Sequence, residues 1–165
     1  MEREVLSLTT RSARQTFDLG MRLGEALAPG DVVALVGELG AGKTQLVRGA
    51  CDGAHVPPRE VASPSFAIVG TYGGRIPIHH ADLYRLADED ELHATGFFDL
   101  LGGAGAVLVE WADRLPGALP EERLEIRLEH GKAMNTRRLV LTGTGPRHAA
   151  LARAIVPAVR GTTAR

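Results

Sequence analysis

The sequence has little of several features that define whole classes of protein. Its single cysteine, Cys51, permits no internal disulfide and predicts a reducing compartment. The first residues lack the apolar stretch of a signal peptide, and no run reaches the roughly 18 apolar residues of a membrane span. We therefore expect a cytoplasmic protein with no membrane association. Nineteen basic and 20 acidic residues give a net charge of −1, which disfavours a chain that grips nucleic acid by itself.

The composition is that of one folded domain. Hydrophobic residues make up 44% of the 165 residues and charged residues 24%, which provides enough apolar surface to offset the entropy cost of ordering the chain. No internal repeat, charge block or low-complexity linker divides the sequence. We therefore expect a single domain over residues 1–165, a length that suits one hydrophobic core.

Short apolar runs alternate with helical patterns along the chain. Residues 32–36 and 106–109 are apolar throughout, which is typical of strands covered on both faces in a parallel sheet. Ser12 and Gln15 have the spacing of a capping box at the start of a helix, and Gly73-Gly74 suits a hairpin turn. Further strands are expected over residues 5–8, 66–72, 76–80, 124–128 and 139–141, and helices over 44–50, 89–94 and 148–156. The alternation predicts a three-layer α/β fold with a mostly parallel central sheet.

One segment matches the P-loop pattern G-x-x-x-x-G-K-[ST] in full: Gly37-Glu38-Leu39-Gly40-Ala41-Gly42-Lys43-Thr44. It lies between an expected strand and an expected helix, as the pattern requires. The glycines permit backbone angles that turn successive N–H groups inward, and the start of the helix adds its positive dipole end. Lys43 can place a compact charge on the outer phosphates, and the Thr44 hydroxyl can bind Mg²⁺. The motif predicts that residues 38–44 bind a nucleoside triphosphate.

A P-loop also needs an acidic residue at the end of a neighbouring strand to hold Mg²⁺. Glu110 directly follows the apolar run 106–109, and Asp82 follows the less regular strand expected near residues 76–80. Both are candidates for the metal site, and for each the alternative is an exposed acid at a strand end. The segment Ser63-Pro64-Ser65-Phe66 fits either a loop that senses the γ-phosphate or an ordinary turn.

Other signatures are absent or weak. The only asparagine, Asn135, does not begin an N-K-x-D guanine reader, and no L-S-G-G-Q signature of transporter ATPases occurs. His79 and His80 are neighbours in an expected strand and therefore point to opposite faces, which disfavours a zinc site there. A residue near Ser12 and a late arginine such as Arg137 stay open as nucleotide contacts, because no motif assigns them.

On these residues the chain resembles the TsaE family, small bacterial ATPases of tRNA threonylcarbamoyladenosine synthesis. Four segments carry the resemblance in an order and spacing that fit the family: 37–44 (GELGAGKT), 63–66 (SPSF), 80–86 (HADLYRL) and 108–111 (LVEW). The similarity spans roughly residues 5–142. The P-loop alone occurs in many families, whereas the set of four is much more specific. Ser65 stands where the family commonly has threonine, which keeps the hydroxyl and removes a methyl group.

The resemblance implies a P-loop ATPase fold, ATP as the substrate and Mg²⁺ as the cofactor. It implies these site residues: Thr44 and Glu110 at the metal, Asp82, Glu110 and Lys43 in hydrolysis, and Ser63 and Ser65 in a switch loop. It also implies slow hydrolysis by the isolated protein and action with the TsaD–TsaB pair, which transfers the threonylcarbamoyl group to tRNA. The tRNA would then be contacted only indirectly, through that complex.

Two other classes of function remain open. A small-molecule P-loop kinase shares the motif and the size, but it needs a second pocket and usually an arginine-rich lid, for which residues 114–127 are too sparse in arginine. A non-hydrolysing, nucleotide-sensing partner protein would bind ATP without turnover. Phosphate release without an added acceptor separates the kinase from the ATPase. Substitution of Asp82 or Glu110 separates the sensor from the ATPase, because only the ATPase needs these residues for turnover of the complex.

Overall fold

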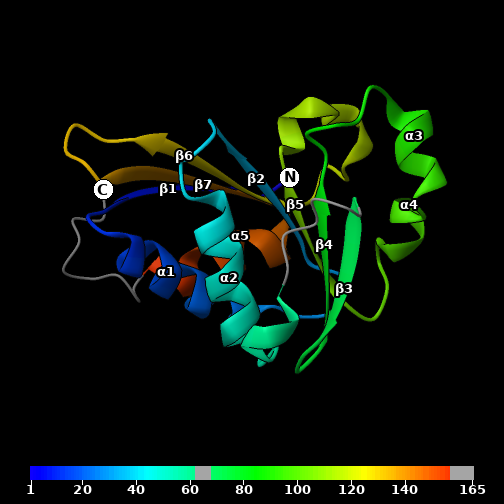
Figure 1. The fold of residues 1–165 in the computed structure, drawn as a ribbon, viewed down its shortest axis with the longest axis horizontal. Helices are drawn as coiled ribbons and strands as arrows, with labels where there is room; N and C mark the ends of the chain where they lie inside the picture. The colour runs from blue at the N-terminus through cyan, green and yellow to red at the C-terminus, as the bar shows by residue number, and fades with distance from the viewer. Residues whose placement is uncertain (62–67, 157–165) are drawn as a thin grey trace.

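The computed structural model describes residues 1–61 and 68–156. Within them, one seven-stranded sheet has the spatial order β1 (Arg3–Thr10), β7 (Arg137–Thr144), β6 (Leu124–His130), β2 (Val32–Gly37), β5 (Ala106–Glu110), β4 (Pro77–Asp82) and β3 (Val69–Gly73). The helices are α1 (Ala13–Ala26), α2 (Lys43–Gly53), α3 (Glu89–Ala94), α4 (Phe97–Leu100) and α5 (Pro146–Ile155) (Figure 1). None of the helices in the described part of the chain is long and apolar enough to span a bilayer.

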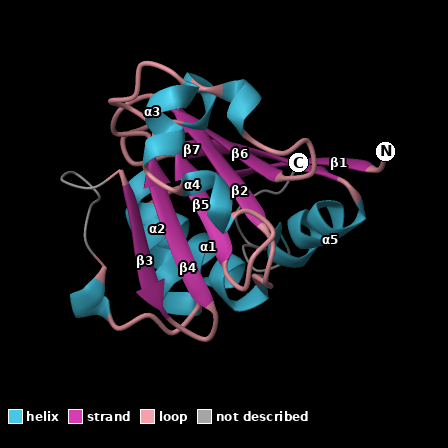
Figure 2. Cartoon of the chain, turned by 90° about the vertical axis from the view of Figure 1, so that its right-hand side faces the viewer, coloured by secondary structure: helices cyan, strands magenta, loops and turns pink. Residues whose placement is uncertain are grey.

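The sheet is mixed. Strands β6, β2, β5 and β4 pair in parallel, whereas β1–β7, β7–β6 and β4–β3 pair antiparallel (Figure 2). The expected parallel arrangement therefore holds for the centre of the sheet and not for its edges. Two antiparallel pairs follow from short connections, since residues 74–76 join β3 to β4 and residues 131–136 join β6 to β7. Connections of that length are too short for the crossover that parallel strands require.

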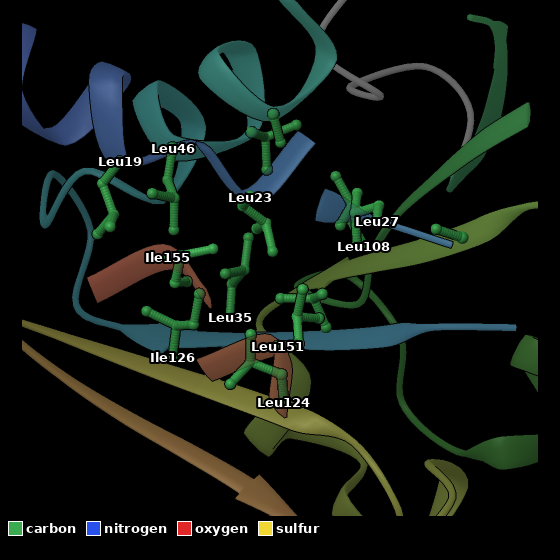
Figure 3. Packing of buried hydrophobic residues seen from close by; sticks show 14 of the residues in the cluster. Leu19, Leu23, Leu27, Leu35, Leu46, Leu108, Leu124, Ile126, Leu151 and Ile155 are labelled. Atoms are coloured by element: carbon green, nitrogen blue, oxygen red, sulfur yellow. The ribbon is translucent and has the colours of Figure 1, made fainter. Parts of the chain in front are cut away.

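Strand β2 is buried on both faces, as its apolar sequence predicts. Val33 and Leu35 pack in a cluster with α1, α2 and α5, part of which is drawn in Figure 3. Ala34 and Val36 pack on the opposite face with residues of α3 and α4. The second cluster takes strand residues from β2, β5 and β4, whereas along β6 buried and more exposed residues alternate. The three layers expected from the sequence are therefore complete in the centre of the sheet.

Most elements begin and end within a few residues of the expected positions. Ser12 caps α1 by accepting a hydrogen bond from the Gln15 N–H at 3.1 Å, while Gln15 Oε1 accepts from the Arg11 N–H at 2.7 Å. Strand β7 continues through Gly143 beyond its expected end at residue 141. A Cβ at Gly143 would lie 2.2 Å from the His148 carbonyl oxygen, so this glycine permits the close packing of α5 on the strand. The first two residues of the strand expected over 66–72 lie outside the described residues.

Helices α1 and α2 pack with their backbones in contact. Each helix carries two glycines four residues apart: Gly20 and Gly24 in α1, and Gly49 and Gly53 in α2. A Cβ at Gly24 would lie 2.0 Å from the Ala50 carbonyl oxygen, and the other three positions are similarly tight. Because α2 starts at Lys43, inside the glycine-rich segment (residues 37–44), this packing fixes the position of the end of that segment.

Candidate functional site

The glycine-rich loop (residues 37–44) joins the end of β2 to the start of α2. Gly40 and Gly42 have φ angles of +78° and +109°, in the left-handed region that favours glycine. The Ala41 N–H donates to the Glu38 carbonyl at 3.0 Å and closes a turn between them. The N-cap residue of α2 is Gly42, which has no side chain with which to cap the N–H groups of the first turn. This is the backbone conformation for which the motif selects glycine.

Lys43 folds back over the loop that precedes it. Its Nζ donates to the carbonyl oxygens of Gly37 and, at 2.9 Å, of Glu38, and the residue is only 4% exposed. Burial lowers the pKa of Lys43 below its ordinary value, although three neighbouring carboxylates oppose this shift: Glu110, Asp113 and Asp82. The ammonium is thus held at the mouth of the loop by two carbonyl groups.

The two acidic candidates end neighbouring strands at the same edge of the sheet. Asp82 of β4 and Glu110 of β5 are register partners in this parallel pair of strands. Glu110 is 4% exposed, and its Oε1 accepts a hydrogen bond from the Thr44 Oγ1 at 3.4 Å. Asp82 is partly exposed, and its Oδ1 accepts from the Tyr84 N–H at 2.9 Å. The fold therefore brings Thr44 and Glu110 together and places Asp82 beside them.

Sequence reasoning did not identify the partner of Glu110 inside the sheet. His80 of β4 is buried, and its Nε2 lies 2.6 Å from Glu110 Oε2. The adjacent His79 points to the other face, where its Nδ1 lies 2.8 Å from Thr71 Oγ1. Alternation along the strand is the signal that could have found this contact, because it puts His80 on the same face as Asp82.

Arg137, at the start of β7, reaches the glycine-rich loop from a distant part of the chain. Its Nε donates to the Ala41 carbonyl at 3.1 Å and its Nη2 donates to the Gly40 carbonyl at 3.2 Å. These bonds restrict the backbone between the two left-handed glycines. Arg137 is therefore a contact of the loop backbone, a role that no sequence motif marks.

Trp111 has an unusual backbone conformation directly after Glu110. Its φ of 55° and ψ of 40° lie in the left-handed region, which bulky residues rarely adopt. This conformation places the ring centroid 4.1 Å from the Lys43 Nζ and 4.8 Å from the Tyr84 ring. The result is a cation–π contact next to the glycine-rich loop.

A cavity of about 480 Å³ opens beside the loop, bordered by Glu38, Trp111, Asp113 and Arg127 among others. Three exposed apolar side chains lie in segments that border this edge of the sheet: Leu39 (84% exposed), Tyr84 (55%) and Met134 (88%). The expected switch-loop residues Ser63 and Ser65 lie outside the described residues. The described site therefore combines a glycine-rich loop, the buried Glu110 carboxylate beside the exposed Thr44 hydroxyl, and an open rim.

A family model, related sequences and a solved structure each match most of this chain. A model of the family described as "Threonylcarbamoyl adenosine biosynthesis protein TsaE" matches residues 10–139. A tRNA threonylcarbamoyladenosine biosynthesis protein TsaE from Bacillus subtilis (strain 168) is 40% identical over 121 residues, which cover 73% of this chain and 74% of that protein. The protein of the same name from Streptomyces coelicolor is 37% identical over 139 residues, or 80% of this chain and 93% of that protein. The crystal structure of YdiB from Bacillus subtilis superposes with a TM-score of 0.78 at 28% identity, covering 95% of this chain and 97% of that one.

Proposed function

The chain belongs to the TsaE family of tRNA threonylcarbamoyladenosine biosynthesis proteins, and from this membership we propose that it is a slow, Mg²⁺-dependent ATPase with a P-loop NTPase fold. ATP binds at residues 38–44. Its hydrolysis supports the TsaD–TsaB complex in forming threonylcarbamoyladenosine in tRNA. The tRNA is contacted only indirectly, through that complex.

The observation that carries the proposal is the loop between β2 and α2. Gly40 and Gly42 are in the left-handed conformation, and Gly42, the N-cap residue of α2, has no side chain with which to cap the helix. Backbone N–H groups in such a loop, together with the positive end of the helix, bind phosphate oxygens. Lys43 exchanges its bonds to loop carbonyls for bonds to the β- and γ-phosphates, where a compact ammonium neutralises charge.

The residues around Thr44 fit a magnesium ion. Mg²⁺ prefers oxygen ligands and is usually held by one or two carboxylates together with substrate phosphates. The Thr44 hydroxyl and the Glu110 carboxylate, 3.4 Å apart at the end of the loop, supply such ligands. When bound, the ion neutralises the charge that builds up on the transferred phosphoryl group.

Asp82 is the residue we assign to the attacking water. It ends the strand next to Glu110, and its backbone position is fixed because its N–H donates to the Ile68 carbonyl at 2.9 Å. A partly exposed carboxylate at this position accepts a hydrogen bond from water and holds it for attack, directly or through a second water.

Dependence on a partner is consistent with two features of this edge. The Arg137 guanidinium is engaged with loop carbonyls, so it serves the loop backbone instead of the transition state. Leu39, Tyr84 and Met134 expose apolar side chains in segments that border this edge of the sheet, where another protein can cover them. We propose that TsaD–TsaB covers this rim and completes the site.

The decisive experiment measures Mg²⁺-dependent phosphate release with and without purified TsaD–TsaB and without an added phosphate acceptor. We expect slow release by the protein alone and faster release with the complex, whereas a small-molecule kinase would be nearly silent in both. Turnover of the isolated protein at tens per second, the rate of a complete enzyme, would contradict the dependence on a partner. Asp82→Ala and Glu110→Ala should each abolish the support of the complex, whereas a non-hydrolysing sensor would tolerate both.

A further inference from the structure

The contact between His80 and Glu110 joins two buried polar side chains of neighbouring strands. His80 is 2% exposed and Glu110 4%, and their Nε2 and Oε2 atoms lie 2.6 Å apart. A carboxylate only accepts hydrogen bonds, so the imidazole donates from Nε2. A bond to a charged acceptor at this distance is among the stronger hydrogen bonds in proteins.

The imidazole has no second polar anchor in the described part of the chain. Its Nδ1 is buried without a hydrogen-bond partner there. Ile78, two residues earlier on the same face of β4, belongs to the apolar core. An apolar side chain at position 80 would therefore suit the packing of the strand, and burying a polar ring with one unpaired nitrogen carries a cost. The bond to Glu110 is what remains to explain a histidine at this position.

The two oxygens of Glu110 face different partners. Oε2 accepts from His80, and Oε1 accepts from the Thr44 hydroxyl. The glutamate side chain has several rotatable bonds, so nothing in its own structure fixes the orientation of the carboxylate. Once His80 holds Oε2, Oε1 has few positions other than the one beside Thr44. The bond from His80 thus sets the orientation of the carboxylate at the end of the glycine-rich loop.

We propose that His80 is a positioning residue, which holds the Glu110 carboxylate so that Oε1 is presented with the Thr44 hydroxyl to the divalent cation that accompanies the nucleotide. This inference rests on the proposed function. Its chemistry is that of an outer hydrogen-bond donor to a metal ligand, and loss of such a donor typically weakens metal affinity by about 10- to 100-fold.

A matched pair of variants tests the proposal. His80→Gln keeps an N–H donor about as far from the backbone as Nε2, whereas His80→Asn carries the same amide one methylene shorter, too far from Glu110. The readout is the affinity for a non-hydrolysable ATP analogue, measured by calorimetry in EDTA and across a Mg²⁺ titration. We expect the apparent Mg²⁺ affinity to fall by about tenfold or more in His80→Asn and to be largely retained in His80→Gln. Affinity in EDTA should be unchanged in both.

His79→Asn is the control, because His79 lies on the opposite face of the same strand and contacts Thr71. Thermal unfolding checks each variant, and His80→Met, an unbranched side chain without a donor, replaces His80→Asn if the latter does not fold. Wild-type Mg²⁺ affinity in His80→Asn, or equal losses in His80→Asn and His80→Gln, overturns the role of His80 alone. Absence of any Mg²⁺-linked nucleotide binding in the wild-type protein overturns the proposed function, and the role of His80 with it.

Discussion

Arg137 and Ala41 lie 96 positions apart in the sequence, yet the Arg137 Nε donates to the Ala41 carbonyl oxygen at 3.1 Å. A second bond runs from Nη2 to the neighbouring Gly40 carbonyl. Strand β7 thereby holds the loop to which we assign phosphate binding. Hydrogen bonds that involve a charged group contribute about 1.5–3 kcal/mol each, enough to favour one loop conformation before a ligand binds.

We therefore expect Arg137→Ala to weaken nucleotide binding by about tenfold, equivalent to about 1.4 kcal/mol, both with Mg²⁺ and in EDTA. Arg137→Lys should recover little, because a single ammonium lacks the fork that spans two carbonyls. Calorimetry measures both affinities. Arg138→Ala is the control, since this neighbour is exposed and contacts Glu129 at 3.6 Å. Equal affinities for Arg137→Ala and Arg138→Ala would refute the role of the contact.

The ammonium of Lys43 should not be replaceable by a guanidinium. Lys43 lies between two loop carbonyls and the Trp111 ring, a space that fits a compact cation. We expect Lys43→Arg to lower the rate of ATP hydrolysis with TsaD–TsaB by about a hundredfold or more, although the substitution keeps the positive charge. Lys132→Arg, at the only other lysine and exposed, should leave the rate unchanged. Phosphate release measures both, and normal activity of Lys43→Arg would show that charge alone is required.

Contact between the backbones of α1 and α2 makes a specific stability prediction. Gly24→Ala places a Cβ 2.0 Å from the Ala50 carbonyl, so the helices must separate, and we expect a loss of about 1–3 kcal/mol. Gly73→Ala is the matched control, because nothing lies within 4 Å of a Cβ there. Its effect should stay within about 0.5 kcal/mol. The free energy of unfolding in urea measures both variants, and similar values for the two would argue against close helix packing.

His148 makes the stability of the fold depend on pH. Its Nε2 accepts from the Val32 N–H at 3.1 Å, and burial lowers its pKa, while nearby charged groups modulate the shift: Asp31, Arg147 and Glu122. The folded protein binds the proton less readily than the unfolded chain, so stability falls as the pH drops below about 6.5, the ordinary value for histidine. Urea unfolding at a series of pH values measures this slope. His148→Gln, which keeps an acceptor without titrating, should flatten it, and an unchanged slope would assign the effect to other groups.

Cys51 should be inert in the folded protein. It is fully buried in α2, and burial raises the pKa of its thiol to about 12. Because the thiolate is the reactive form, an aromatic disulfide reagent at about pH 8 should label the native protein slowly and the urea-unfolded protein rapidly. The absorbance of the released thiolate follows the reaction. Immediate labelling of the native protein would mean that α2 is not packed as described.

The features that the sequence predicted well depend on residues close together along the chain. The glycine-rich loop is eight consecutive residues. The P-loop pattern requires glycine, lysine and a hydroxyl residue at fixed positions within it, which Gly42, Lys43 and Thr44 supply. The strand before it is apolar at every position because it is buried on both faces. Glu110 and Asp82 became candidates from similarly local information, namely that a P-loop needs an acidic residue at the end of a neighbouring strand.

The sequence pattern does not specify which distant segments of the chain are in contact in the fold. Arg137 reaches Ala41, His80 turns Glu110 toward Thr44, and Gly24 admits the backbone of α2, although no motif links the members of any pair. Each contact depends on strand order, register and helix packing, which arise from burial summed over the whole chain. Local chemistry therefore specified the loop and its candidate ligands, and long-range packing decided how those ligands are oriented and held.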